Sequence, residues 1–219
     1  MILVRDTFRI RFGKIDQAVD HFRRLSEKFP TIFPGLEGTR FELMTDISGP
    51  MYTVYDYSIF PSIQAWEDGL QVLFASAGFQ DWFKDWKQYV EDGSREFFHI
   101  ERDNEGWSSP GALIVRSCFR ALEWRVHDAV ALLTDHGALL ADAGVAVRHR
   151  VLTDASGRMF NVVQEVETTD LGTWEEHRRT MFSNPTFQSW FRRLLTCVSS
   201  GTNEFYTLAA MSSIKAKGG

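Results

Sequence analysis

The sequence predicts an α+β fold made of two tandem copies of one β-α-β-β-α-β unit, and three observations predict it. The decapeptide TDISGPMYTV, which begins at Thr45, returns as TDASGRMFNV at Thr153, with six of ten positions identical. Other matching segments follow in the same order along the chain. Within each copy the apolar pattern changes from the period of two that is typical of strands to helical spacing, and back again. An internal repeat of this length determines the architecture.

The other matches extend the repeat over about 100 residues. The first strands are offset by 111 residues and the later elements by 108, so the second copy lacks three residues between its first strand and its hairpin. The matching pairs are VRDTFR from Val4 with VRSCFR from Val115, Trp66-Glu67 with Trp174-Glu175, FQDWF from Phe79 with FQSWF from Phe187, and GSREF from Gly93 with GTNEF from Gly201.

Each copy opens with a strand and a helix. Residues 2–10 and 113–120 alternate apolar and polar side chains, which predicts half-buried strands. In the first copy, apolar residues then follow helical spacing over 18–29, and Pro30 predicts the end of that helix. The equivalent helix is expected over 127–143.

A hairpin, a second helical segment and a last strand complete each copy. The TDxSG segments supply the Asp, Ser and Gly that tight turns prefer, so Asp46 and Asp154 are expected to cap the chain there. The helical segments are expected to break near 77–78 and 184–185. The expected hairpins are 38–44 with 51–59 and 145–152 with 159–167, the helical segments are 63–89 and 171–198, and the last strands are 95–102 and 203–209.

These boundaries divide the 219 residues into four parts. Residues 1–103 form the first repeat, 104–111 a polar linker, 112–210 the second repeat and 211–219 a disordered tail. The linker is short, which predicts that the two repeats stay adjacent.

Composition excludes several classes of partner. The net charge is −5, so no basic field favours nucleic acid. No run approaches the roughly 18 apolar residues of a membrane span, and the charged N-terminus is unlike a signal peptide. Two cysteines without a CxxC motif predict free thiols in a reducing cytoplasm, and the histidines show no metal-binding spacing, so we expect no metal.

The order of elements is the ferredoxin-like pattern, with both helices on one face of an antiparallel sheet. The other face of each sheet must be covered, and two such sheets in one chain can cover each other. This arrangement resembles the dimeric α+β barrel superfamily, here as an intrachain pseudo-dimer. The F-x-x-W-F and G-x-x-E-F patterns of both copies are similar to those of NIPSNAP-type and related stress-responsive or antibiotic-biosynthesis-monooxygenase-type members.

Strand alternation then predicts which side chains point away from the helices. Arg5, Arg9, Arg116 and Arg120 are expected to line a shared cavity, where paired guanidinium groups bind an anionic ligand. The alternative is that arginines and glutamates from facing sheets neutralise one another in a wet interface.

Four more residues complete the predicted site. Tyr55 and His149 are the candidates for the catalytic group that transfers protons. Cys118 occupies the place of Thr7 on the equivalent strand, and it and His99 are expected to contact a ligand. A buried structural thiol is the alternative for Cys118, because no Cys-His dyad is recognisable.

The resemblance implies two functions. Cofactor-independent monooxygenases of this superfamily act on aromatic, polyketide-like substrates, which implies a small apolar or anionic ligand and no cofactor. Chlorite dismutase relatives of the same fold bind haem through a histidine of the second repeat. His177 lies in the required helical segment, but its charged neighbours predict a solvated side chain, and His127 and His136 are expected to face away from the cavity.

A third function needs no chemistry. Trp82, Trp86 and Trp107, if exposed, would dock a protein partner or a second copy of the chain. Nucleotide-binding and hydrolase fingerprints are absent from the sequence. Whether the chain is an enzyme and whether it forms a homo-oligomer are left open.

Overall fold

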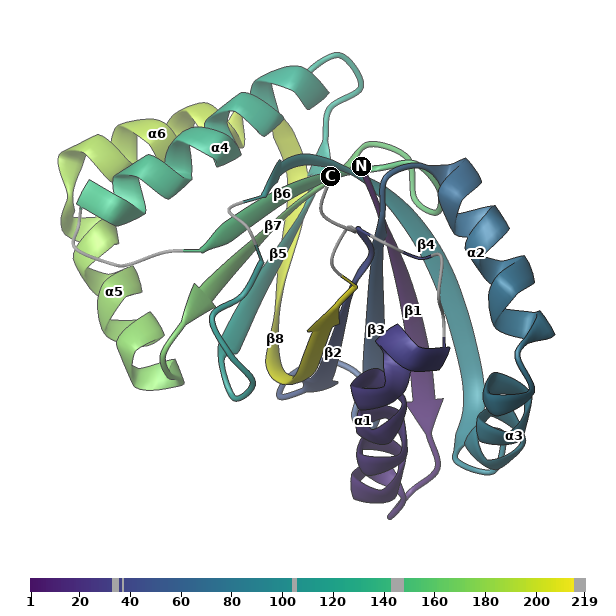
Figure 1. Cartoon of the computed structure of the whole chain (residues 1–219). Helices are drawn as coiled ribbons and strands as arrows, with labels where there is room; N and C mark the ends of the chain where they lie inside the picture. The colour runs from purple at the N-terminus through teal and green to yellow at the C-terminus, as the bar shows by residue number, and fades with distance from the viewer. Residues whose placement is uncertain (33–35, 37, 104–105, 143–147, 215–219) are drawn as a thin grey trace. The chain divides into compact units, whose positions relative to one another are not determined.

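The computed structural model describes all residues except 33–35, 37, 104–105, 143–147 and 215–219. The chain divides into two compact units. Unit 1 comprises Met1–Phe97 and Leu208–Gly219, and unit 2 comprises Phe98–Thr207. Each unit contains one β-α-β-β-α-β copy, and the strands β4 and β8 pass from one unit into the other (Figure 1).

The elements follow the predicted order in both copies. The first copy consists of β1 (Ile2–Ile10), α1 (Ile15–Ile32), β2 (Arg40–Asp46), β3 (Thr53–Phe60), α2 (Ile63–Ala75), α3 (Ala77–Trp86) and β4 (Val90–Asp103). The second copy consists of β5 (Leu113–Ala121), α4 (Val126–Asp142), β6 (His149–Asp154), β7 (Asn161–Thr168), α5 (Leu171–Ser183), α6 (Pro185–Leu195) and β8 (Val198–Ser213).

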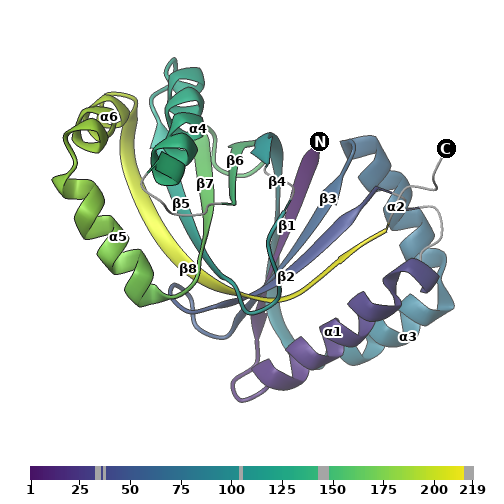
Figure 2. The same cartoon turned by 60° about the vertical axis from the view of Figure 1, so that its left-hand side comes forward.

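The strands hydrogen-bond in the closed order β1-β3-β2-β8-β5-β7-β6-β4. The pairs β1–β3, β2–β3, β4–β6, β5–β7, β5–β8 and β6–β7 are antiparallel. The predicted fold, two tandem ferredoxin-like repeats that make one α+β barrel, is therefore confirmed. Within unit 1, α1 and α3 lie side by side, as do α4 and α6 within unit 2 (Figures 1 and 2).

Three elements, β4, β8 and α1, differ clearly from their predicted limits. The strands β4 and β8 have 14 and 16 residues, longer than predicted, because they continue from one unit into the other. Helix α1 continues to Ile32, so the prediction that it ends before Pro30 is wrong. A proline in the last turn removes a single backbone hydrogen bond and so does not prevent the helix from finishing that turn.

The predicted domain limits stay predictions. Residues 104–105 of the predicted linker, 145–147 of the predicted hairpin and 215–219 of the predicted tail lie outside the described residues. The beginning of that tail, up to Ser213, belongs to β8, and Ile214 is buried.

The repeated TDxSG segment forms the same turn twice. Tyr52 and Phe160, which follow it, both have a left-handed backbone, with φ of 60° and 64°. Their carbonyls accept equivalent hydrogen bonds, from Ile10 N at 2.7 Å and from Ala121 N at 2.8 Å. The Asp46 carboxylate accepts from Thr53 N at 2.7 Å, which confirms that it caps the turn.

Side-chain caps explain why the second helical segment breaks in both copies. Ser76 separates α2 from α3, and its hydroxyl accepts from the backbone N–H of Phe79. Asn184 separates α5 from α6 and directly precedes Pro185, the first residue of α6. Its side-chain oxygen accepts a hydrogen bond of 2.8 Å from Thr186 N. A capping side chain satisfies N–H groups that the first helical turn leaves free, so each break is encoded locally.

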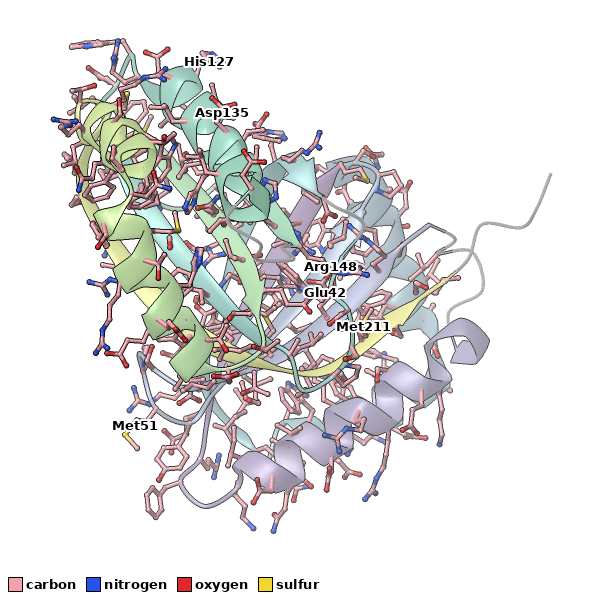
Figure 3. All side chains as sticks on the ribbon, turned by 90° about the vertical axis from the view of Figure 1, so that its left-hand side faces the viewer. Glu42, Met51, His127, Asp135, Arg148 and Met211 are labelled. Carbon is pink, nitrogen blue, oxygen red and sulfur yellow. The ribbon has the colours of Figure 1, made fainter. Side chains whose placement is uncertain are left out.

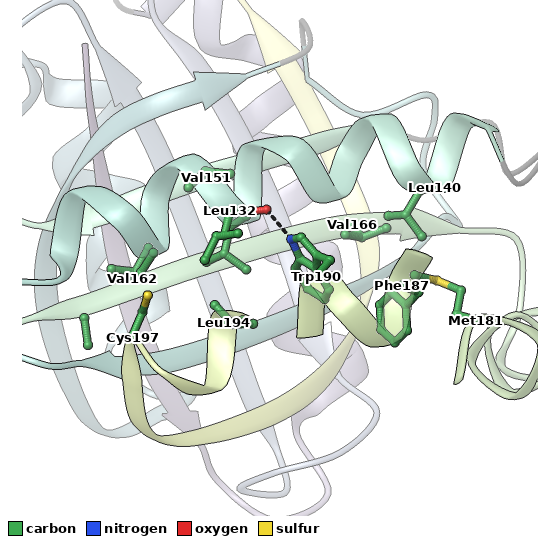
Figure 4. Close-up of a cluster of buried hydrophobic side chains, with 13 residues drawn as sticks. Leu132, Leu140, Val151, Val162, Val166, Met181, Phe187, Trp190, Leu194 and Cys197 are labelled. Atoms are coloured by element: carbon green, nitrogen blue, oxygen red, sulfur yellow. Dashed lines mark hydrogen bonds between the residues drawn. The ribbon is translucent and has the colours of Figure 1, made fainter. Parts of the chain in front are cut away.

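Each unit has its own core between its helices and its sheet. In unit 2 the core gathers Leu132 of α4, Val162 of β7, and Trp190 and Leu194 of α6 (Figure 4). The Trp190 indole donates a hydrogen bond of 2.6 Å to the Leu132 carbonyl.

Among the described helices, none is long and apolar enough to cross a membrane.

Candidate functional site

Two of the predicted arginines are buried and already paired within their own unit. Arg5 donates to Glu96 at 2.9 Å, and its guanidinium lies 4.6 Å from the centre of the Tyr55 ring. Arg116 donates to Glu165 at 2.5 Å, and Glu165 is completely buried. Each arginine is thus neutralised by a glutamate of its own unit, and Arg116 and Glu165 lie on neighbouring strands, whereas the alternative placed such pairs between facing sheets.

The other two predicted arginines are exposed. Arg9 lies 3.9 Å from Glu91, and Arg120 lies over the Phe160 ring at 5.6 Å. Arg150 is a further arginine that is completely buried, with Glu165 at 3.5 Å and the Trp107 ring at 4.8 Å. The predicted set therefore divides into two buried groups and two exposed groups.

Tyr55 and Cys118 lie on strand faces turned away from the helices, as alternation predicts. Tyr55 is buried, and the free thiol of Cys118 is partly buried. His99 is exposed on β4. The structure does not test a binding or catalytic role for these residues, so the roles stay predictions.

His149 is buried on the opposite, helix-covered face of its sheet. Its ring packs against Gly137 of α4 so closely that a Cβ at Gly137 would lie 2.2 Å from it. Burial lowers the pKa of His149, so the imidazole is neutral at neutral pH. Its role as a proton handler is likewise untested.

A cavity of about 360 Å³ lies on this helix-covered side of unit 2. Cavities of this size hold small organic ligands, which are oriented by a few polar groups in an apolar wall. The aromatic wall comes mainly from α5 and α6. The aromatic lining residues are Phe119, Trp174, Phe182, Phe187, Trp190 and Phe191. The polar lining residues are Ser117, His136, Gln164, His177, Arg178, Ser199, Ser200, Thr202 and Asn203.

Gln164 and His136 form a hydrogen-bond chain at this cavity. The Gln164 amide N–H donates to the Leu133 carbonyl at 2.9 Å, which sets the orientation of the amide. Its oxygen therefore faces His136 Nδ1, 2.8 Å away, and accepts a hydrogen bond from it. The proton of the neutral ring lies on Nδ1, and this arrangement assigns a free lone pair to Nε2.

The surroundings keep His136 neutral. The ring is buried and stacks on Trp190, with ring centres 4.3 Å apart. Burial lowers the pKa of His136 to about 4, although the hydrogen bond to Gln164 opposes that shift. Within the described part of the chain, Nε2 is buried and has no hydrogen-bond partner. An acceptor without a donor in an apolar pocket is costly to leave unsatisfied.

His177 of α5 also lines the cavity. It is only partly exposed, its Nε2 is buried without a partner among the described residues, and burial lowers its pKa. The prediction that charged neighbours keep this side chain solvated is therefore wrong, because the fold buries much of the ring, although Arg178 of the same charged run also lines the cavity. His127, by contrast, is exposed, and lies on the same helix, α4, as the exposed Asp135 (Figure 3).

The sequence-based prediction placed the ligand on the strand face turned away from the helices and so missed His136 and Gln164. One signal was available. Gln164 and Ser117 interrupt the apolar positions of β7 and β5 that face the helices, where a core residue is expected. Trp86 and Trp107 are buried, so neither meets the condition of exposure on which the docking alternative depended.

In the part of the chain that the structure describes, no group of three His, Cys, Asp or Glu side chains lies close enough together to bind a metal ion. The cavity of unit 2 therefore offers hydrogen-bonding and proton-accepting groups, with the His136 and His177 imidazoles as single nitrogen ligands.

Comparison with known proteins shows similarity at the level of structure. No family model matches the sequence, and no curated protein matches it. A candidate monooxygenase from Lactobacillus acidophilus NCFM superimposes with a TM-score of 0.73 at 10% identity, covering 99% of this chain and 97% of that one. An anthrone oxidase-like protein gives a TM-score of 0.68 at 12% identity, covering 97% and 93%.

A haem-binding protein from Thermus thermophilus is also similar, with a TM-score of 0.58 at 8% identity over 94% of this chain and 90% of that one. NIPSNAP proteins and a candidate chlorite dismutase are among the other structures found. At these identities the comparisons establish the fold alone: the chain is a tandem dimeric α+β barrel, a fold that it has in common with monooxygenase-like and haem-binding proteins.

Proposed function

We propose that the unit 2 cavity binds a planar aromatic molecule with an acidic O–H or C–H group and oxidises it with molecular oxygen, without a cofactor. The observation that carries the proposal is the bare Nε2 lone pair of His136, whose tautomer is set by Gln164. A ligand that donates a hydrogen bond satisfies this lone pair, and the aromatic wall packs against the ligand ring.

The reaction follows from a neutral imidazole beside an electron-rich ring. His136 Nε2 takes a proton from the substrate, and the resulting imidazolium is stabilised by the anion that it creates. The anion passes electrons to O₂, and a C–O bond forms. For a ring CH₂ of the anthrone type, the carbon becomes C=O, one oxygen atom stays in the product and the other leaves as water with the two hydrogens. The substrate thus loses the four electrons that O₂ gains.

The resemblance in fold to an anthrone oxidase-like protein supports this choice of substrate class. The test is to mix the purified protein with anthrone and to follow oxygen uptake together with quinone absorbance. Binding is measured separately as quenching of tryptophan emission, since Trp190 stacks on His136. We expect turnover that is lost in His136→Leu and reduced in Gln164→Leu, which frees the tautomer.

The matched control is His127→Leu, because His127 lies on the same helix but is exposed. It should leave both binding and turnover unchanged. Full activity of a folded His136→Leu variant, or the absence of ligand quenching in the unaltered protein, would contradict the proposal.

Haem binding is the second candidate, and one observation favours it. Two imidazoles of unit 2, His136 and His177, reach the aromatic cavity with an Nε2 that has no partner among the described residues. Either nitrogen would hold the iron of a haem, and the bound group would supply redox chemistry toward oxygen or peroxide. The residues present therefore fit the group.

Reconstitution with haem separates the two candidates. A Soret band that disappears in His136→Leu or in His177→Leu, but persists in His127→Leu, favours haem. A protein that stays colourless after reconstitution excludes haem and leaves the cofactor-independent reaction as the proposal.

A further inference from the structure

A second cavity, of about 270 Å³, occupies the equivalent place in unit 1. Its apolar wall resembles that of unit 2, with Phe60, Trp66 and Phe79 among the lining aromatic residues. Its polar groups differ completely. The titratable residues that the structure places in its lining are Asp6, Asp56 and Arg95.

The two carboxylates face each other across neighbouring strands. Asp6 of β1 pairs directly with Asp56 of β3, and both side chains line the cavity. Like charges at directly opposed positions destabilise a sheet. At the equivalent positions of unit 2, Ser117 pairs with Gln164, which carry no charge. The opposed pair of Asp6 and Asp56 therefore departs from the pattern that stabilises strand pairing, and departures of this kind are expected at functional sites.

Arg95 neutralises only one of the two carboxylates. Its guanidinium forms a fork with Asp6, with both N–O distances at 2.6 Å. The same guanidinium lies over the Trp66 ring, 5.2 Å from its centre. Two N–H groups of Arg95 are directed at Asp6, so the positive charge of the guanidinium is already matched by that carboxylate.

Asp56 is the carboxylate of this cavity that Arg95 does not contact through a hydrogen bond. Although the residue as a whole is only partly buried, its Oδ1 atom is buried and has no hydrogen-bond partner in the described part of the chain. A buried carboxyl oxygen in an aromatic cavity needs either a proton or a cation.

We propose that the unit 1 cavity binds an apolar primary amine in its protonated form, with the ammonium donating to Asp56 Oδ1 and the apolar body packed against Phe60, Trp66 and Phe79. An ammonium supplies both the missing hydrogen bond and the missing positive charge, since the site holds two carboxylates and one guanidinium. This site is separate from the proposed unit 2 site and does not depend on it.

Binding is coupled to a proton. Burial, and then repulsion from Asp6, raises the pKa of Asp56 well above its ordinary value, while Arg95 opposes the rise. The carboxyl of the free cavity is therefore protonated at a pH where an exposed aspartate is ionised. An ammonium ligand favours the ionised form, so binding releases a proton and weakens as the pH falls.

The experiment uses 2-phenylethylamine as the probe and 2-phenylethanol as its neutral analogue, with affinity measured by calorimetry and tryptophan quenching. The full-length protein should bind the amine more tightly than the alcohol. Asp56→Asn should weaken amine binding by about tenfold to 100-fold, the range expected for loss of a charged hydrogen bond. Binding of the alcohol should change less than threefold, roughly the scatter of such a comparison.

The exposed aspartate Asp16, at the start of α1, provides the matched control. Asp16→Asn should leave amine binding unchanged. The unaltered protein gives a measurement that needs no variant: calorimetry in buffers of different ionisation enthalpy should detect proton release on amine binding. Equal affinity for amine and alcohol, absence of proton release, or undiminished amine binding by a folded Asp56→Asn variant each overturns the proposal.

Discussion

The helix-covered cavities of the two units have the same construction and opposite polar chemistry. Both have an aromatic wall from the second helical segment and polar side chains on the first and third strands of the copy. Unit 2 presents a neutral network built on His136 and Gln164, whereas unit 1 presents Asp56 and a paired Asp6 and Arg95. The duplicated wall provides the shape of both cavities, and a few substituted positions decide what each one attracts.

The largest expected difference between the units is sensitivity to acid. The folded unit 2 holds the pKa of His136 at about 4, whereas an unfolded histidine titrates near 6.5. Between these values the unfolded chain binds the proton, so stability is lost as the pH falls from 6.5 to about 4. The loss should approach about 3 kcal/mol for this single group. The equivalent residue of unit 1 is Leu25, so His136→Leu introduces the side chain that unit 1 already has at this position. The free energy of unfolding of this variant should depend less on pH over this range.

Chemical denaturation at several pH values measures this difference. The exposed His127 serves as the control, since His127→Leu should keep the full pH dependence. Equal slopes for His136→Leu and the unaltered protein would show that His136 is not held neutral by the fold.

The next difference lies where α4 and α1 approach their sheets. A Cβ at Gly137 would lie 2.2 Å from the buried His149 ring. The equivalent residue of unit 1 is Ser26, which already has a Cβ and is buried. We expect Gly137→Ala to destabilise the protein by about 1–3 kcal/mol through overpacking, despite the better helix propensity of alanine.

Thermal unfolding compares this variant with Ser26→Ala, which should cost less. His149→Ala removes the ring that the new methyl group would strike, so the double variant should cost less than the sum of the single changes. If the free-energy costs of Gly137→Ala and His149→Ala were additive, the alanine methyl group would not clash with the His149 ring.

A smaller difference concerns two equivalent indoles. Trp190 donates to the Leu132 carbonyl at 2.6 Å in a buried site, and Trp82 donates to the His21 carbonyl at 3.1 Å in a partly buried one. Replacing Trp190 by phenylalanine should cost about 1–3 kcal/mol and replacing Trp82 about 1 kcal/mol or less, because water compensates better in the second site. Denaturant midpoints of the two variants give the order, and a larger cost at Trp82 would contradict it.

The smallest expected effect is at the breaks between paired helices. Asn184 accepts hydrogen bonds from two backbone N–H groups, and Ser76 accepts one, at 3.4 Å. Loss of a cap costs about 1 kcal/mol, so Asn184→Ala should exceed Ser76→Ala by a few tenths of a kcal/mol. Midpoint shifts of equal size would indicate that each break is stabilised by packing alone.

The sequence predicted most of the fold because the information is local and doubled. The Thr45 and Thr153 segments set the register of the repeat, and the strand alternation around Val4 and Val115 assigns the two faces of each sheet. Ser76 and Asn184 mark helix breaks through their own side chains. The end of α1 was predicted wrongly, because a proline in the last helical turn removes one backbone hydrogen bond without ending the helix.

The candidate site could not be predicted in the same way. Strand alternation predicted that Arg5 and Arg116 lie on the strand faces turned away from the helices, but their pairing with Glu96 and Glu165 depends on contacts between strands that are distant in the chain. His136 lies 28 residues from Gln164, and no spacing rule joins a helix residue to a strand residue at that distance.

The sequence by itself determined a duplicated α+β unit, the faces of its strands and the positions of its turns, because each of these follows from short-range periodicity and backbone preference. Only the tertiary structure decided that the cavities lie under the helices, that Gln164 leaves the Nε2 of His136 without a proton, and that Asp56 faces Asp6. These features depend on contacts between segments distant in the chain, where burial removes water and turns ordinary polar side chains into groups that need a ligand.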